Sequence, residues 1–350
     1  MSYETLQTVW FILIAVLWIG YFVLEGFDFG VGILLRTIGK NEAERRALVT
    51  TLGPLWDGNE VWLLVAGGAT FAAFPEWYAT LFSGFYLPLF LILFGLIIRG
   101  VAFEYRSKHG DIVWRQRWDW AILIGSFLPS LLWGVAFANL VRGTQLEQQA
   151  NTGFLYTGGF WALLNPFSLL GGLVTLTLFI THGAIFVSLK TDGDIRYRAR
   201  DLAFRIGLVA AVLAVVFLLW AQIAYSNNTW TWAPVLLAAV CWLAAIACVR
   251  AGREGWSFLF SALTLALAVI SLFGMLYPNL MPNLDHVAGH GLDIHNASST
   301  ETTLKIMTGV AVVLTPIVLL YQGWTYWIFR KRLTAAQIPN PEQGILDTVH

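Results

Sequence analysis

The sequence contains very little charge. Only 12% of its 350 residues are Asp, Glu, Lys or Arg, against about 25% in a typical soluble domain, and 57% are apolar. This scarcity excludes an ordinary soluble domain and indicates an integral membrane protein of the all-α class. The net charge of zero says nothing by itself, and we expect no nucleic-acid partner.

Cysteine is also scarce, and histidine is nearly absent from the apolar segments. The two cysteines, Cys241 and Cys248, are seven residues apart, about 10 Å along a helix, which is too far for a disulfide. We interpret them as packing residues. His182 is the one histidine within an apolar segment. It could be a haem ligand or a hydrogen-bonded polar residue, and we favour the second interpretation.

Three histidines and two aspartates share one loop, between residues 278 and 303. Their spacing matches no closed metal-ligand pattern, so we expect solvated side chains and no metal site. These residues are His286, His290, His295, Asp285 and Asp293. A cleavable signal peptide is not indicated, because the N-terminus lacks a basic region and its apolar run leads into acidic residues.

Nine segments are long and apolar enough to cross a membrane as helices. The second is the least regular, because it opens with the polar run WDGNE. We expect one transmembrane domain at 1–335 and a polar cytoplasmic tail at 336–350. The expected helices lie approximately at 7–35, 53–73, 77–104, 118–141, 162–189, 201–225, 230–250, 255–277 and 304–330.

The positions of the basic residues predict the orientation of these helices. Of the 21 Lys and Arg residues, all but Arg99, Arg142 and Lys305 fall in alternate connections or at the C-terminal end. Basic loops stay in the cytoplasm. The pattern therefore predicts an N-terminus outside, a C-terminus inside and an odd number of spans.

Several ionisable residues lie within the predicted helices. Glu25 and Asp28 are three residues apart and share a helix face, and Asp57 and Glu60 repeat this spacing. Arg99 is the basic residue among them. All belong to the cytoplasmic half of the helices. Charges inside a membrane are costly and commonly functional, so a proton path entering from the cytoplasm is one interpretation and a structural ion pair is the other.

Several motifs carry a family resemblance over nearly the whole chain. Taken in order, they resemble subunit II of the cytochrome bd-type quinol oxidases of bacteria, and the IHNASST stretch looks most like actinobacterial members. The first two motifs are highly specific in combination. The motifs are LEGFDFGVG at 24–32, GPLWDGNEVWL at 53–63, GGATFAAFP at 67–75, RSK at 106–108, LLWGVAFANL at 131–140, LNPF at 164–167, LYPNLMP at 276–282, IHNASST at 294–300, LKIMT at 304–308 and YQGWTYW at 321–327.

The resemblance implies an architecture and an activity. The family's subunit II has two four-helix bundles and one peripheral helix, and pairs with a subunit I that carries two haems b and one haem d. Small accessory subunits join some complexes, and some members hold a structural quinone. The oxidase transfers electrons from quinol to oxygen and draws protons from the cytoplasm, so it separates charge without pumping. In this subunit no residue is expected to be catalytic.

The resemblance also assigns candidate residues. Glu25, Asp57 and Arg99 match the positions of the proton path, and Asp28 and Glu60 match the same motifs as secondary candidates. Trp56 could contact a quinone or serve in packing, and we favour packing.

Two other hypotheses fit part of the sequence. A stand-alone proton-coupled transporter would also use buried carboxylates, and it would purify without haem or a partner chain. A haem-bearing subunit would need several internal His or Met ligands. Too few residues of these types lie in the predicted spans for three haems, so we favour the haem-free subunit.

Overall fold

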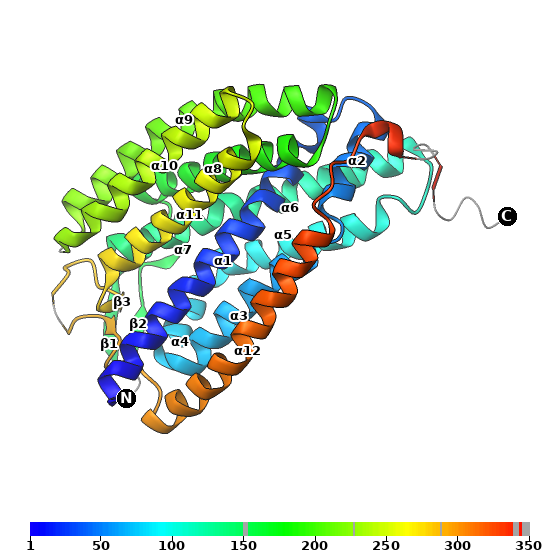
Figure 1. Ribbon diagram of the computed structural model, residues 1–350. Coiled ribbons are helices and arrows are strands. Elements are labelled where there is room, and N and C mark those ends of the chain that lie inside the picture. Colours follow the sequence, from blue (N-terminus) through cyan, green and yellow to red (C-terminus); the bar gives the residue numbers. More distant parts are fainter. Residues whose placement is uncertain (150–152, 227, 288, 339–342, 345–350) are drawn as a thin grey trace.

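Long helices lie side by side through most of the chain (Figure 1). The computed structural model describes residues 1–149, 153–226, 228–287, 289–338 and 343–344. The α-helices are α1 Tyr3–Ile38, α2 Glu42–Leu52, α3 Trp56–Ala73, α4 Pro75–Gly84, α5 Tyr86–Tyr105, α6 Ile112–Arg142, α7 Gly159–Ala162, α8 Pro166–Lys190, α9 Asp194–Ala224, α10 Trp232–Arg250, α11 Glu254–Leu276 and α12 Glu301–Ile328. Two 3₁₀ turns, η1 Thr229–Thr231 and η2 Ala335–Gln337, and two short antiparallel strand pairs complete the described elements: β1 Leu146–Gln149 with β2 Gly153–Tyr156, and β3 Asn279–Met281 with β4 Leu292–Asp293.

The predicted all-α membrane fold is confirmed. In the described part of the chain, eight helices are long and apolar enough to cross a membrane: α1, α5, α6, α8, α9, α10, α11 and α12. The second predicted span corresponds to α3, which has 18 residues and is not among the eight, because Asp57, Asn59 and Glu60 make its first turns polar.

One predicted helix is divided in two. The segment 77–104 was expected to be continuous, but α4 ends at Gly84 and α5 begins at Tyr86. Pro88 explains the break, because its ring would clash with the carbonyl group of Gly84 in an uninterrupted helix. Pro75 likewise stands at the start of α4 and separates it from α3.

Side-chain caps set where several helices begin. The LNPF motif starts α8: the Asn165 side chain accepts a hydrogen bond from the Ser168 amide, and Pro166 occupies the first turn. The α8 helix therefore begins later than the predicted residue 162. Thr300 caps α12 in the same way, through the amide of Thr303.

The two predicted four-helix groups pack against each other, most extensively through α6 and α8. The first contains α1, α3, α5 and α6, and the second contains α8, α9, α10 and α11, with α1 and α6 packed against α8 between them. The α12 helix lies along the outer edge beside α1 and α3 (Figure 1). Only 6% of its most apolar window is buried, which makes it the predicted peripheral helix.

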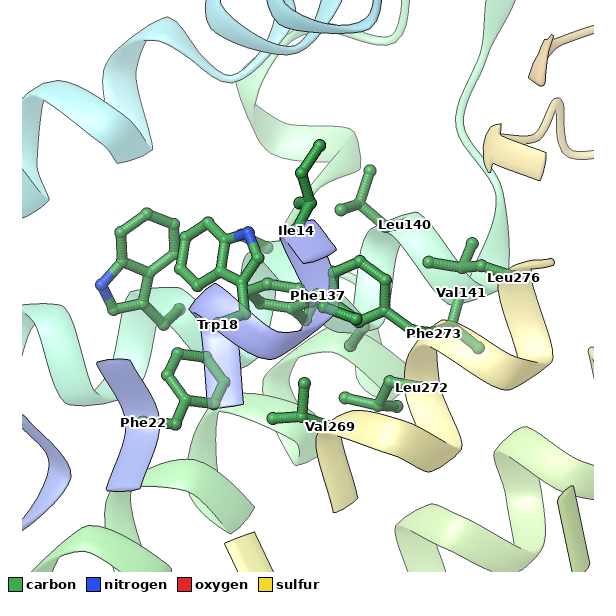
Figure 2. Close-up of a cluster of buried hydrophobic side chains, with 14 of the residues drawn as sticks. Ile14, Trp18, Phe22, Phe137, Leu140, Val141, Val269, Leu272, Phe273 and Leu276 are labelled. Atoms are coloured by element: carbon green, nitrogen blue, oxygen red, sulfur yellow. The ribbon is translucent and has the colours of Figure 1, made fainter. Parts of the chain in front are cut away.

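An aromatic core joins α1, α6 and α11. Figure 2 shows Trp18 and Phe22 of α1 facing Phe137 of α6 and Phe273 of α11. The Trp18 ring lies 4.8 Å from the Phe137 ring and 4.7 Å from that of Trp133, both edge to face, an arrangement that stabilises aromatic pairs.

The predicted basic loops meet at one end of the molecule, where ion pairs connect them. The fully buried Arg106 bonds to Glu42 of α2 at 2.9 Å and to Asp119 of α6 at 2.6 Å. Arg198 of α9 pairs with Glu44 at 2.6 Å. Loops that are far apart in sequence thus form one charged surface, at the end that the sequence analysis predicts to be cytoplasmic.

The segment after α12 returns to this surface. The Leu333 amide donates to the Lys190 carbonyl at 2.8 Å, and Arg46 donates to the Gln343 carbonyl at 3.2 Å. Ala335 and Ile338 pack against apolar residues at this end of the helices. Residues 339–342 and 345–350 of the predicted tail lie outside the described residues.

Candidate functional site

A buried ion pair forms the centre of the candidate site. Arg99 of α5 donates a hydrogen bond to Glu25 of α1, and both side chains have an exposed fraction of 0%. The Arg99 guanidinium also lies 4.6 Å from the ring centre of Phe29 and 5.7 Å from that of Phe103. Aromatic faces stabilise a cation where water is excluded, so they help to hold Arg99 in place.

Asp28 completes the buried part of the site one helical turn from Glu25. It is fully buried, and its Oδ2 accepts a hydrogen bond of 2.7 Å from Asn59 of α3. One oxygen of each carboxylate, Oε2 of Glu25 and Oδ1 of Asp28, has no hydrogen-bond partner among the described residues. These oxygens are therefore available to bind and release a proton.

Two further carboxylates connect this buried part with the cytoplasmic end of α3. Glu60 is partly buried and interacts electrostatically with both Arg99 and Asp57. Asp57 is exposed in the first turn of α3. The structure thus joins Glu25 directly to Arg99, whereas Asp57 makes no salt bridge with this pair and interacts electrostatically with Glu60. Burial increases from Asp57 through Glu60 to Glu25 and Asp28.

The peripheral helix α12 contributes residues that the sequence analysis missed. The Tyr326 hydroxyl donates to Asn59 Oδ1 at 2.7 Å, and the Gln322 amide donates to the same oxygen at 3.3 Å. Trp62 of α3 in turn donates to Gln322 at 2.7 Å. Only the match of the YQGWTYW motif pointed to this segment, and its exposed Trp324 and Trp327 are typical of membrane-interface residues.

His182 is not arranged as a haem ligand. Its Nε2 lies 3.1 Å from the Val23 carbonyl oxygen, which can only accept, so this nitrogen carries the hydrogen. Its Nδ1 lies 2.7 Å from the Ser261 hydroxyl. Both ring nitrogens are therefore engaged, and this confirms the hydrogen-bonded interpretation.

Each of the three loop histidines has a different hydrogen-bond partner. His290 bonds to Asp285 at 2.7 Å, His295 to Gln7 at 3.0 Å and His286 to the Arg142 carbonyl at 2.8 Å. Within the described residues, no group of three or more His, Cys, Asp or Glu side chains could hold a metal ion.

Trp56 packs against Phe103 with ring centres 5.4 Å apart.

Comparisons with known proteins identify the class of this chain. Residues 6–329 match the family described as cytochrome bd terminal oxidase subunit II. The chain is 39% identical to cytochrome bd-I ubiquinol oxidase subunit 2 of Escherichia coli, covering 96% of this chain and 97% of that protein. It is 41% identical to cytochrome bd ubiquinol oxidase subunit 2 of Bacillus subtilis, covering 94% and 97%.

A solved structure shares the fold. The bd oxidase structure from Geobacillus thermodenitrificans matches with a TM-score of 0.73 at 20% identity, over 93% of this chain and 100% of that chain. The chain therefore belongs to the cytochrome bd terminal oxidase subunit II family, and with its apolar helices it is a multi-pass protein of the bacterial plasma membrane. These findings give no support to the transporter hypothesis, and the likeness to actinobacterial members stays a prediction.

Proposed function

We propose that this chain acts as the haem-free subunit II of a quinol oxidase and guides protons from the cytoplasm toward the oxygen-reducing centre of its partner. Family membership supports the partner and the overall reaction. The observation that carries the role of this chain is the buried Glu25–Arg99 pair with Asp28 beside it, inside membrane-spanning helices.

The gradient of burial gives the proposed path its direction. A proton from the cytoplasm is taken up at the exposed Asp57, passes Glu60 and reaches Glu25 and Asp28. The positive charge of Arg99 lowers the cost of holding several carboxylates in a medium of low polarity. This chain supplies proton positions and their electrostatic control, while the electron transfer takes place elsewhere in the complex.

The haems belong to the partner in this proposal. The family implies two haems b and one haem d in subunit I, which would supply the electron-transfer and oxygen chemistry. In this chain both ring nitrogens of His182 are hydrogen-bonded, so it is not arranged as an iron ligand. A structural quinone and small accessory subunits are further proposals that follow from the family, and for Trp56 packing against Phe103 remains the favoured role. We also propose that residues 1–335 act as one transmembrane domain with a cytoplasmic tail after it.

Purification of the tagged chain from its native membrane tests this proposal. We expect absorption bands of haem b and haem d, together with a second multi-spanning chain that carries the haem ligands. A colourless chain without a partner would contradict the proposal and favour a transporter.

A further inference from the structure

A polar cavity of about 210 Å³ lies at the outer end of the helices, far from the carboxylate site. It is enclosed by the C-terminal end of α6, the β1–β2 hairpin, the segment around α7 and the outer loop. Its polar lining comes from Asn139, Arg142, Thr144, Gln145, Tyr156, Trp161 and Asn165.

The cavity presents hydrogen-bond donors. Asn165 donates to Asn139 Oδ1 at 2.8 Å, and the Tyr156 hydroxyl donates to the Gly159 carbonyl at 2.8 Å, so these groups are already engaged. In the described part of the chain, the side chains of Arg142, Gln145 and Trp161 make no hydrogen bond to protein, and no carboxylate lines the cavity. A guanidinium, an amide and an indole N–H together suit an anion and exclude a cation.

Arg142 differs from the other basic residue on the outer side. Lys305 pairs with Glu301 at 2.6 Å, whereas no described carboxylate lies within 4.0 Å of the Arg142 guanidinium. Arg142 and Tyr156 both line the cavity. Burial raises the pKa of the Tyr156 phenol, and the charge of Arg142 opposes that rise.

The position along the membrane normal indicates which anion is present at this level. Arg142 is the last residue of the 31-residue helix α6, and the rim residue Trp161 is 80% exposed. Exposed tryptophans lie at the level of the lipid headgroups. The cavity therefore opens where phospholipid phosphates are concentrated.

We propose that this cavity binds a phosphate group, supplied by a phospholipid of the outer leaflet, through Arg142 with Gln145 and Trp161. Arg142 forms charge-assisted hydrogen bonds to two phosphate oxygens, and the two neutral donors bind the remaining oxygens. The inference rests on the outer cavity alone and is independent of the proton path.

Native mass spectrometry of the delipidated complex, titrated with phosphatidylglycerol in a non-ionic detergent, tests the site. We expect Arg142→Gln to weaken the tightest lipid-binding step by at least about tenfold, because two charge-assisted hydrogen bonds are lost. Arg142→Lys keeps the positive charge but removes the paired N–H donors of the guanidinium group, so it should give an intermediate loss of lipid affinity. Lys305→Gln is the matched control and should bind as the unchanged complex does.

A parallel titration with inorganic phosphate distinguishes the source. Lipid binding that depends on Arg142 and is not displaced by inorganic phosphate supports the phospholipid. Binding of inorganic phosphate that depends on Arg142, together with lipid binding that does not, keeps the phosphate site but overturns the lipid as its occupant. Equal lipid and phosphate binding by the unchanged complex and Arg142→Gln, with intact haem bands, overturns the site altogether.

Discussion

The buried charges show how a membrane protein stabilises groups that are costly in lipid. Glu25 and Arg99 are fully buried and neutralise each other, while Asp28 depends on the hydrogen bond from Asn59. Removing one member of a buried pair leaves the other without a counter-charge, which in proteins costs about 3–5 kcal/mol. The pair is therefore energetically coupled.

A double-mutant cycle tests this coupling. We expect Arg99→Gln to lower the thermal midpoint of the purified complex strongly, because the charge of Glu25 is then uncompensated. In the double variant Glu25→Gln with Arg99→Gln, the thermal midpoint should fall by clearly less than the sum of the decreases in the two single variants. Differential scanning calorimetry of the four proteins measures this, and strict additivity of the losses would contradict the direct ion pair.

Tyr326 offers a narrower test of how Asp28 is positioned. Tyr326→Phe removes only the hydroxyl group that donates to Asn59 Oδ1, so Asn59 is held less firmly against Asp28. We expect oxygen reduction to slow by about two- to tenfold, consistent with the loss of one hydrogen bond of roughly 0.5–1.5 kcal/mol. The pH profile of turnover should shift while the haem spectrum stays unchanged.

The matched control for Tyr326→Phe is Tyr321→Phe on the same helix, whose side chain is exposed. It should leave turnover and the pH profile unchanged. Identical pH profiles for the unchanged complex and Tyr326→Phe would show that this hydroxyl has no positioning role.

At the scale of the helices, close backbone contact fixes how α1 crosses α8. A Cβ atom added at Gly183 would lie 2.6 Å from the Gly30 Cα atom, so the two helices meet at their glycines. Gly30 lies two residues after Asp28 on α1, and Gly183 directly follows His182 on α8. The crossing therefore affects the position of the charged face of α1.

Gly183→Ala is expected to push these helices apart. Overpacking of this kind costs about 1–3 kcal/mol and should lower the thermal midpoint of the complex by several degrees. Gly309→Ala on α12, where an added Cβ atom meets nothing within 4 Å, is the control and should have no measurable effect. Equal midpoints for the two variants would refute the close crossing.

Helix positions were more predictable than helix ends. Hydropathy located the spans because each needs about 20 apolar residues, but it gave no sign of the break at Phe85, which depends on one proline ring. In the site, motif spacing identified the acidic residues and Arg99. It could not identify Gln322 and Tyr326, because their contacts to Asn59 span more than 260 residues of sequence and depend on where α12 packs.

At the scale of the whole molecule, the distribution of charge agrees with the proposed direction of proton movement. Ion pairs connect the basic loops at the predicted cytoplasmic end, and the series of increasingly buried carboxylates from Asp57 to Glu25 begins on that side. The four carboxylates of the proposed proton path all lie in the predicted cytoplasmic half of the helices. Proton uptake from the cytoplasm is therefore the central claim.

The most direct test is the turnover of the haem-normalised complex carrying Glu25→Ala or Asp57→Ala, measured as oxygen consumption with saturating quinol. The account predicts that both variants slow oxygen reduction, Glu25→Ala the more strongly because its position is buried, while the haem b and haem d bands remain. Glu104→Gln, at an exposed carboxylate near the cytoplasmic end of α5, should be unaffected. Normal turnover in both alanine variants would contradict the proton path, and loss of haem would indicate a structural role instead.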